Sequence, residues 1–131
     1  MTATALQVSN LTTTFGHHGS AVTAVDAISF TVLAGEVLGL VGESGSGKSV
    51  TLRSIMRLMP HQSSVTGQVL WQGRDLMAMT DAQLRKVRGR EISIIFQEPT
   101  TALNPVLPVS VQIEENLRAH TTLSRAERGR R

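Results

Sequence analysis

The stretch "GESGSGKS", Gly42 to Ser49, follows the pattern G-x-x-x-x-G-K-[ST]. Glycines let the backbone curl so that consecutive N–H groups point inward, and the helix that follows adds its positive N-terminal end. Lys48 supplies a full positive charge to outer phosphates, and the Ser49 hydroxyl can ligate magnesium, which prefers oxygen ligands. The stretch therefore predicts a polyphosphate and Mg²⁺ site formed by Gly42, Ser44, Gly45, Ser46, Gly47, Lys48 and Ser49.

The segments on either side of this loop have the periodicity that such a motif requires. Val37 to Val41, "VLGLV", is a nearly continuous apolar run, which is typical of a strand buried on both faces of a parallel sheet. From Lys48 onward the period becomes helical, and Pro60 is expected to end the helix. One face of this predicted helix carries Leu52, Ile55, Met56 and Met59.

Other strands are predicted from alternation and from turn residues. Val25 to Val32 alternates between apolar and polar residues, which indicates a half-buried strand. Leu6 and Val8 indicate a second strand, and Val65 to Leu76 reads as a strand closed by a Gln72-Gly73 turn. Ile92 to Phe96 is a short apolar run that predicts another buried strand.

Two capping boxes predict helix starts in the C-terminal part of the chain. Thr80 with Gln83 forms one box, and Leu84 and Val87 would be the inner face of its helix. Val109 to His120 is also expected to be helical. The second box, Ser124 with Glu127, lies only a few residues before Arg131. A helix this short is marginal, which suits either a chain cut within a domain or a frayed basic tail.

Composition narrows the class of protein. A chain of 131 residues is the size of one domain, it has no cysteine, and it contains no apolar run of transmembrane length. Its N-terminus does not read as a signal peptide. Nine of its 13 Lys and Arg residues lie from Arg85 onward, which suits either a nucleic-acid surface or solvated helix faces. We expect no nucleic-acid partner, because aromatic residues are scarce and nucleic-acid modules usually combine them with basic residues.

The loop alone does not select the nucleotide. A guanine-reading N-K-x-D motif is not present in the sequence, which disfavours a GTPase, whereas a small-molecule kinase stays open on this motif alone. His17 and His18 could suggest a metal site, but neighbouring residues in an extended segment point apart. We interpret "HHGS" as a polar loop.

Three segments resemble the ATP-binding-cassette (ABC) family. The loop reads G-x-S-G-x-G-K-S, "TGQVLWQGRDL" is similar to the cassette segment that follows the loop's helix, and "FQEPTTALNP" resembles the glutamine loop of oligopeptide and dipeptide importer ATPase subunits. The resemblance runs from about Leu6 to the end of the chain and corresponds to the first half of a cassette.

The fold implied by this resemblance is a truncated α/β P-loop NTPase, the ABC nucleotide-binding domain. Residues 1–36 and 65–76 would form an N-terminal antiparallel β subdomain, and residues 37–60 and 91–97 the P-loop core. Residues 98–131 would be the start of the helical subdomain.

The resemblance also implies roles for residues outside the loop. Gln97 would sense the γ-phosphate side of ATP through magnesium or the attacking water, so it is both the expected catalytic residue and a second metal contact. Phe15 lies where cassettes carry an aromatic residue that stacks on adenine, although a Phe near a strand end is frequently part of the core.

Gln97 and Glu98 have an alternative interpretation, as the end of the strand that delivers the metal-binding acid. In that case Glu98 would be the catalytic base and Gln97 would replace the aspartate that holds magnesium. A neutral glutamine is a poor partner for a hard cation. It also follows Lys48 by only 49 positions (97−48), the separation at which cassettes place the glutamine loop. We therefore favour the glutamine loop.

The partners and location implied by the resemblance are those of a peptide importer. Glu98 to about Leu117 would face transmembrane permease subunits. A second ATP-binding subunit would complete a homo- or heterodimer, and a solute-binding protein outside the membrane would act indirectly. The chain would then lie at the cytoplasmic face of the plasma membrane as a peripheral component.

The sequence also departs from a whole cassette. "LSRAE", Leu123 to Glu127, is not the L-S-G-G-Q signature, and neither an Asp-Glu strand nor a switch histidine follows Gln97. We therefore expect ATP binding coupled to importer function in a full-length family member, and no hydrolysis by this chain. A non-catalytic ATP-binding fragment or gene remnant is the alternative. Exposed apolar strand edges predict an isolated chain that is poorly soluble or partly molten.

Overall fold

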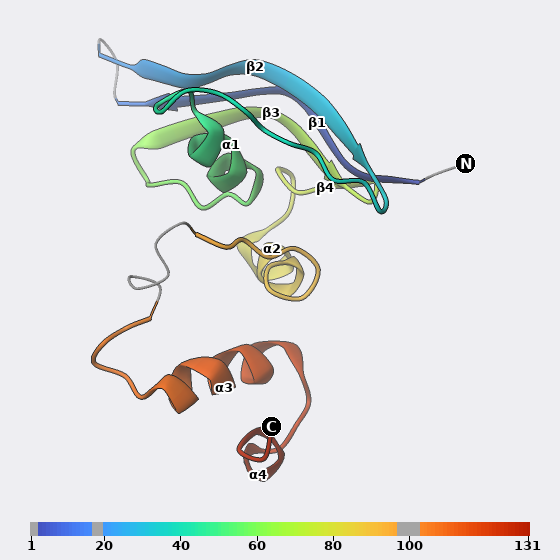
Figure 1. Ribbon diagram of the computed structural model, residues 1–131, viewed down its shortest axis with the longest axis vertical. Coiled ribbons are helices and arrows are strands. Elements are labelled where there is room, and N and C mark those ends of the chain that lie inside the picture. Colours follow the sequence, from blue (N-terminus) through green and yellow to red (C-terminus); the bar gives the residue numbers. More distant parts are fainter. Residues whose placement is uncertain (1–2, 17–19, 97–102) are drawn as a thin grey trace. The chain divides into compact units, whose positions relative to one another are not determined.

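Four antiparallel strands and three longer helices dominate the computed structural model, which describes residues 3–16, 20–96 and 103–131 (Figure 1). The chain divides into two compact units, Met1–Met79 and Thr80–Arg131. The first unit holds the sheet and α1 (Lys48–Ile55), and the second holds α2 (Asp81–Val87), α3 (Val109–His120) and the short α4 (Arg125–Arg128).

The sheet has the strand order β2-β1-β3-β4, with every pairing antiparallel. Its strands are β1 (Thr4–Phe15), β2 (Val22–Leu33), β3 (Ser63–Trp71) and β4 (Arg74–Asp75). The alternation predicted for β2 is confirmed, because Ile28, Phe30 and Val32 are half-buried while Ser29 and Thr31 are exposed. The sheet is the N-terminal antiparallel β subdomain that the sequence predicted.

The predicted turn at Gln72-Gly73 joins β3 to β4. Both residues have positive φ, 48° and 78°, which is the combination found in a type I′ hairpin turn. This turn matches the right-handed twist of the flanking strands. It therefore sets the register in which Trp71 pairs with Arg74.

Helix α1 packs against one face of the sheet, and the core of the first unit lies between them (Figure 1). A buried hydrogen bond of 2.7 Å joins the hydroxyls of Thr13 on β1 and Ser54 on α1. The buried apolar residues of this unit are Val8, Leu11, Val25, Ile55, Met56, Val69 and Leu76.

The buried face of α1 agrees with the prediction in part. Ile55 and Met56 are buried as predicted, whereas Leu52 is 44% exposed. Thr51 and Ser54 are buried as well, and the apolar periodicity missed them because both are polar and hydrogen-bonded. The helix also ends at Ile55, before Pro60, because Arg57 adopts a left-handed φ of 51°.

The left-handed Arg57 closes α1 with a Schellman motif. The N–H of Leu58 donates to the carbonyl of Arg53 at 2.8 Å, and the N–H of Arg57 donates to that of Ser54 at 2.9 Å. These two bonds satisfy carbonyls that would otherwise be left at the helix end.

The strands predicted at Val37–Val41 and Ile92–Phe96 are wrong. Neither segment is a strand in the structure, and Val37, Val41 and Ile95 are each at least 95% exposed. Within the described ranges, the only bridge to either segment is a single parallel one between Arg88 and Ile92. An apolar run indicates that a segment tends to be buried. It becomes a strand only where a neighbouring strand pairs with its backbone N–H and C=O groups.

The second unit confirms the predicted helix starts. Thr80 and Gln83 form one reciprocal capping box, and Ser124 and Glu127 form the other. Leu84 and Val87 are buried as expected, and α3 covers the predicted residues Val109–His120. None of the described helices is both long and apolar enough to cross a bilayer.

Candidate phosphate-binding site

The loop Gly42–Ser49 leads into α1 and is curled by two left-handed glycines. Gly45 has a φ of 83° and Gly47 a φ of 86°, values that residues with a Cβ rarely adopt. Between them, the N–H of Ser46 donates to the carbonyl of Glu43 at 3.2 Å. The sequence therefore folds into the tight curl that its glycine spacing predicted.

The ammonium group of Lys48 lies inside this curl. Nζ donates to the carbonyls of Gly42 at 2.7 Å and Glu43 at 2.6 Å, and to Oγ of Ser46 at 3.0 Å. A Cβ on Gly42 would lie 2.6 Å from that same Oγ, so a side chain there would displace the Ser46 hydroxyl from Nζ. The loop therefore holds a positive charge close to its own backbone carbonyls.

The end of the loop is anchored to the sheet at Gly47. A Cβ on this residue would lie 2.4 Å from the carbonyl oxygen of Ala24 on β2. The carbonyl of Gly47 also accepts from both the N–H and the hydroxyl of Thr51, at 2.8 and 3.0 Å. These contacts fix the first turn of α1 against the strand.

Several backbone donors of the loop have no acceptor among the described residues. They are the N–H groups of Gly45, Gly47, Lys48 and Ser49, at or just before the N-terminus of α1. Free N–H groups at a helix N-terminus attract anions through hydrogen bonding and the helix dipole. Together with the Lys48 ammonium they make a site whose donors suit a polyphosphate.

The predicted magnesium contacts are only partly described. Ser49 is exposed in the first turn of α1, where its hydroxyl is accessible, whereas Gln97 and Glu98 lie outside the described residues. Among the described residues, no group of three or more His, Cys, Asp or Glu side chains could hold a metal ion. The role of Ser49 toward magnesium stays a prediction.

Phe15 is the last residue of β1 and is half-buried. It is paired with Val22 on β2 and Ser63 on β3, so its backbone is held in the sheet. Its stacking on adenine stays a prediction, and so does the alternative role in the core. His17 and His18 lie outside the described residues.

The sequence did not predict the residues of the sheet and of α1 that hold the phosphate loop in position. The carbonyl of Ala24 and the Thr13–Ser54 hydrogen bond belong to elements distant in sequence, and no local motif marks them. Arg57 likewise belongs to none of the motifs that mark the site. Its Nη1 donates to the carbonyls of Leu76 at 3.3 Å and Met79 at 2.6 Å, which ties the segment after β4 to the end of α1.

The loop that opens α1 has the G-x-x-x-x-G-K-[ST] pattern of the P-loop NTPases. Residues 25–130 match the family model described as ABC transporter, and the chain belongs to this family.

Relatives of this chain are named as peptide importers. A putative peptide import ATP-binding protein of Brucella abortus (strain 2308) is 47% identical over 131 residues. A dipeptide transport ATP-binding protein of Bacillus subtilis (strain 168) is 46% identical over 122 residues. These alignments cover 99% and 92% of this chain, but only 40% and 36% of the two relatives. The chain therefore spans well under half the length of the relatives it matches.

Solved structures agree on the fold. An ATP-binding cassette in a dimeric post-hydrolysis state with ADP and phosphate has a TM-score of 0.77 at 26% identity. The match covers 95% of this chain and 53% of the cassette chain. The fold is thus that of part of an ABC cassette, as the sequence predicted, while the finer subdomain limits stay a prediction.

Proposed function

We propose that this chain is the ATP-binding component, or part of it, of an ABC importer for peptides or similar small solutes. The observation that carries the proposal is the Lys48 ammonium in a loop whose neighbouring N–H groups have no acceptor among the described residues. The peptide-import names of relatives at 46–47% identity support the substrate class.

In this proposal the loop binds the phosphates of ATP. Lys48 exchanges its bonds to the loop carbonyls for phosphate oxygens. The N–H groups of Gly45, Gly47, Lys48 and Ser49 donate to the same anion. Ser49 and Gln97 would contact magnesium, and Phe15 would stack on adenine. When bound, the metal neutralises charge that develops on the phosphates.

The proposed assembly is a peripheral one at the cytoplasmic face of the membrane. The region from Glu98 to about Leu117 would face a permease, and a second ATP-binding subunit would complete the dimer. The dimeric form of the similar cassette supports the second partner. Within the described part of that region, Leu103, Val106 and Ile113 are exposed apolar residues, which suits a protein contact.

Equilibrium binding of MgATP to the 131-residue chain tests the loop. Lys48→Ala removes the ammonium group that lies inside the loop, so we expect the affinity to fall roughly 10- to 100-fold. Arg118→Ala, which removes one positive charge from α3, is the matched control and should change the affinity less than about threefold. Equal losses in the two variants, or no ATP binding by the unmodified chain, would contradict the assignment.

A non-catalytic ATP binder is the second candidate. Phosphate release from ATP separates the two candidates. Steady turnover that disappears in Lys48→Ala would exclude a non-catalytic chain, whereas binding without turnover would favour it.

A further inference from the structure

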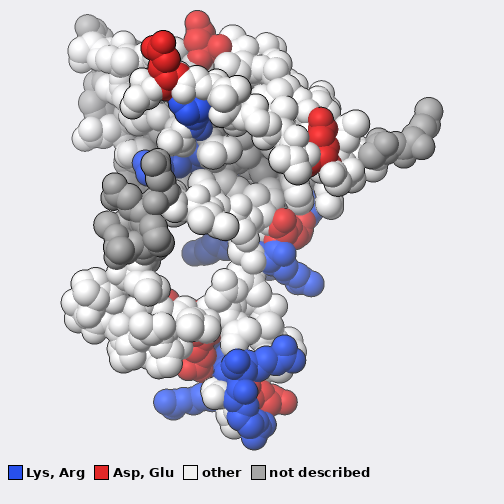
Figure 2. All heavy atoms as spheres, in the orientation of Figure 1, with Lys and Arg blue, Asp and Glu red and all other residues white. Residues whose placement is uncertain are grey.

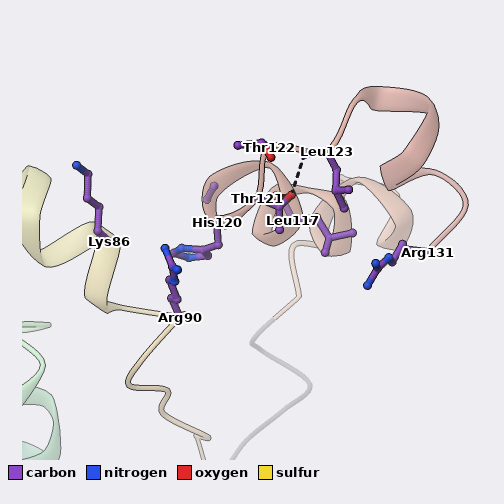
Figure 3. Close-up of a pocket in the computed structure, with 9 residues that line it drawn as sticks. Lys86, Arg90, Leu117, His120, Thr121, Thr122, Leu123 and Arg131 are labelled. Carbon is purple, nitrogen blue, oxygen red and sulfur yellow. Dashed lines mark hydrogen bonds between the residues drawn. The ribbon is translucent and has the colours of Figure 1, made fainter.

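An open hollow of about 680 Å³ lies in the C-terminal unit, away from the phosphate loop in sequence (Figure 3). Its walls come from α2, from the turn that follows α2, from the C-terminal end of α3, and from the last residue of the chain. All of these segments belong to the same compact unit, Thr80–Arg131.

The lining of this hollow is basic. Lys86, Arg90, His120 and Arg131 all contribute to it, and none of the lining residues is acidic. Figure 3 shows the His120 ring directed toward the turn that carries Arg90. That turn is close to the ring, because a Cβ on Gly89 would lie 2.8 Å from Nε2 of His120. The charges are therefore gathered by the fold from segments about 45 residues apart (131−86).

A neighbouring hollow in the same unit shows a different charge balance. It is lined by Arg118, Arg125 and Arg128 together with Glu114 and Glu115, and Nε of Arg128 lies 3.0 Å from Oε1 of Glu114. By contrast, Lys86, Arg90 and Arg131 have no ion pair within the part of the chain that the structure describes. Figure 2 shows Lys and Arg side chains gathered over α4 and the chain end. Like charges without counter-charges create a positive potential that attracts anions.

We propose that this basic hollow binds a phosphate-bearing anion with at least two negative charges. Guanidinium groups match phosphate oxygens with paired N–H donors, and the Lys86 ammonium and the Thr122 hydroxyl add further donors. The volume lies within the range of small-molecule sites, so it takes more than a single phosphate. Leu117 and Leu123 line the same hollow and suit the carbon part of such a ligand.

Pyrophosphate binding to the Lys48→Ala chain tests this site, because that background removes the cation of the phosphate loop. Isothermal titration calorimetry should detect binding, and Lys86→Gln with Arg90→Gln should weaken it about tenfold or more. Arg118→Gln with Arg125→Gln is the matched control, since it removes the same two positive charges from the neighbouring hollow, and it should change the affinity less than about threefold. Lys86 and Arg90 are exposed, so these substitutions leave the core intact, which circular dichroism verifies.

A second arm distinguishes a soluble ligand from a lipid headgroup. The same variants are sedimented with vesicles that contain cardiolipin, whose headgroup carries two phosphates, and with neutral phosphatidylcholine vesicles. Pyrophosphate binding that depends on Lys86 and Arg90 supports a soluble ligand. Retention on cardiolipin vesicles alone, lost in the double variant, assigns the site to a lipid phosphate. Absence of both, or an equal loss in the variant that combines Arg118→Gln with Arg125→Gln, overturns the proposal.

Discussion

Gly47 meets two separate requirements that only a residue without a Cβ satisfies. Its φ of 86° is left-handed, and the position of its missing Cβ is filled by the carbonyl oxygen of Ala24. The motif pattern accounts for the first requirement, because the loop must curl. The second requirement comes from the sheet, because only a residue without a Cβ lets the N-terminus of α1 approach β2 this closely.

Gly47→Ala is therefore expected to cost more stability than Gly45→Ala. The left-handed φ costs each alanine variant about 1–2 kcal/mol of folding free energy. A Cβ on Gly45 has no other atom within 4 Å, so that variant has no further cost. The clash with Ala24 should add about 1–3 kcal/mol to the loss at Gly47. Urea unfolding of the two variants measures the difference. Equal unfolding free energies would mean that the loop does not rest on β2.

For single residues, the sequence predicts which side chains lie in the phosphate loop better than it predicts which residues hold that loop in place. Lys48 was placed in the site by its motif, and its ammonium is in the loop. Ala24 and Arg57 could not be found this way, because a backbone carbonyl carries no side-chain signal and an arginine after a helix usually points to solvent.

Between elements, the Thr13–Ser54 hydrogen bond is the polar contact that joins β1 to α1 inside the core. Both residues have a relative exposure of 0%, so neither hydroxyl has water as a substitute partner. Removing one hydroxyl leaves the other unsatisfied, whereas removing both leaves an apolar contact.

A double-mutant cycle with Thr13→Val and Ser54→Ala should show this coupling. Each single substitution is expected to cost about 1–3 kcal/mol, and the double variant should cost clearly less than their sum. Equilibrium unfolding in urea gives the four free energies. Additive effects would show that the two hydroxyls contribute independently.

The capping box that begins α4 depends on the ionisation of Glu127. Its carboxylate accepts from the Ser124 hydroxyl at 2.6 Å and from the Ser124 N–H at 2.8 Å, and these bonds lower the pKa of Glu127. A lowered folded pKa means that the box contributes fully above the ordinary glutamate pKa of about 4.3. Its contribution is lost as the pH falls through the lower, folded value.

An NMR titration of the Glu127 side chain measures this effect. The midpoint should lie below that of an ordinary glutamate and should return toward it in Ser124→Ala, which removes the hydroxyl donor. The Ser124 amide shift should move with the same midpoint. An unchanged midpoint in Ser124→Ala would rule out the hydroxyl as the cause.

The elements that were predicted correctly have local signals. Capping boxes, the Gln72-Gly73 turn and the alternation in β2 are decided by residues within a few positions of one another. The strands predicted at Val37–Val41 and Ile92–Phe96 depend on partners elsewhere, and no described strand pairs with them in a ladder. Pairing is a property of the sheet, so an apolar run cannot establish it alone.

For the whole molecule, the exposed apolar residues have a consequence for solution behaviour. Val37, Val41, Ile95 and Val106 are each at least 84% exposed. We expect the isolated chain to bind a hydrophobic dye and to self-associate. Val37→Thr with Val41→Thr should lower dye binding and leave the circular dichroism unchanged. A sharp cooperative melt with a monomeric sedimentation profile in the unmodified chain would contradict this expectation.

Arg57 has a practical consequence for dissecting the gene. Its guanidinium group holds the carbonyl of Met79, the last residue of the N-terminal unit, against the end of the helix that carries the phosphate loop. The segment from Leu76 to Met79, which follows β4, is therefore hydrogen-bonded to the end of α1 before the second unit begins. A shortened chain that ends at Met79 would therefore keep the phosphate loop, the sheet and the Arg57 hydrogen bonds in one segment.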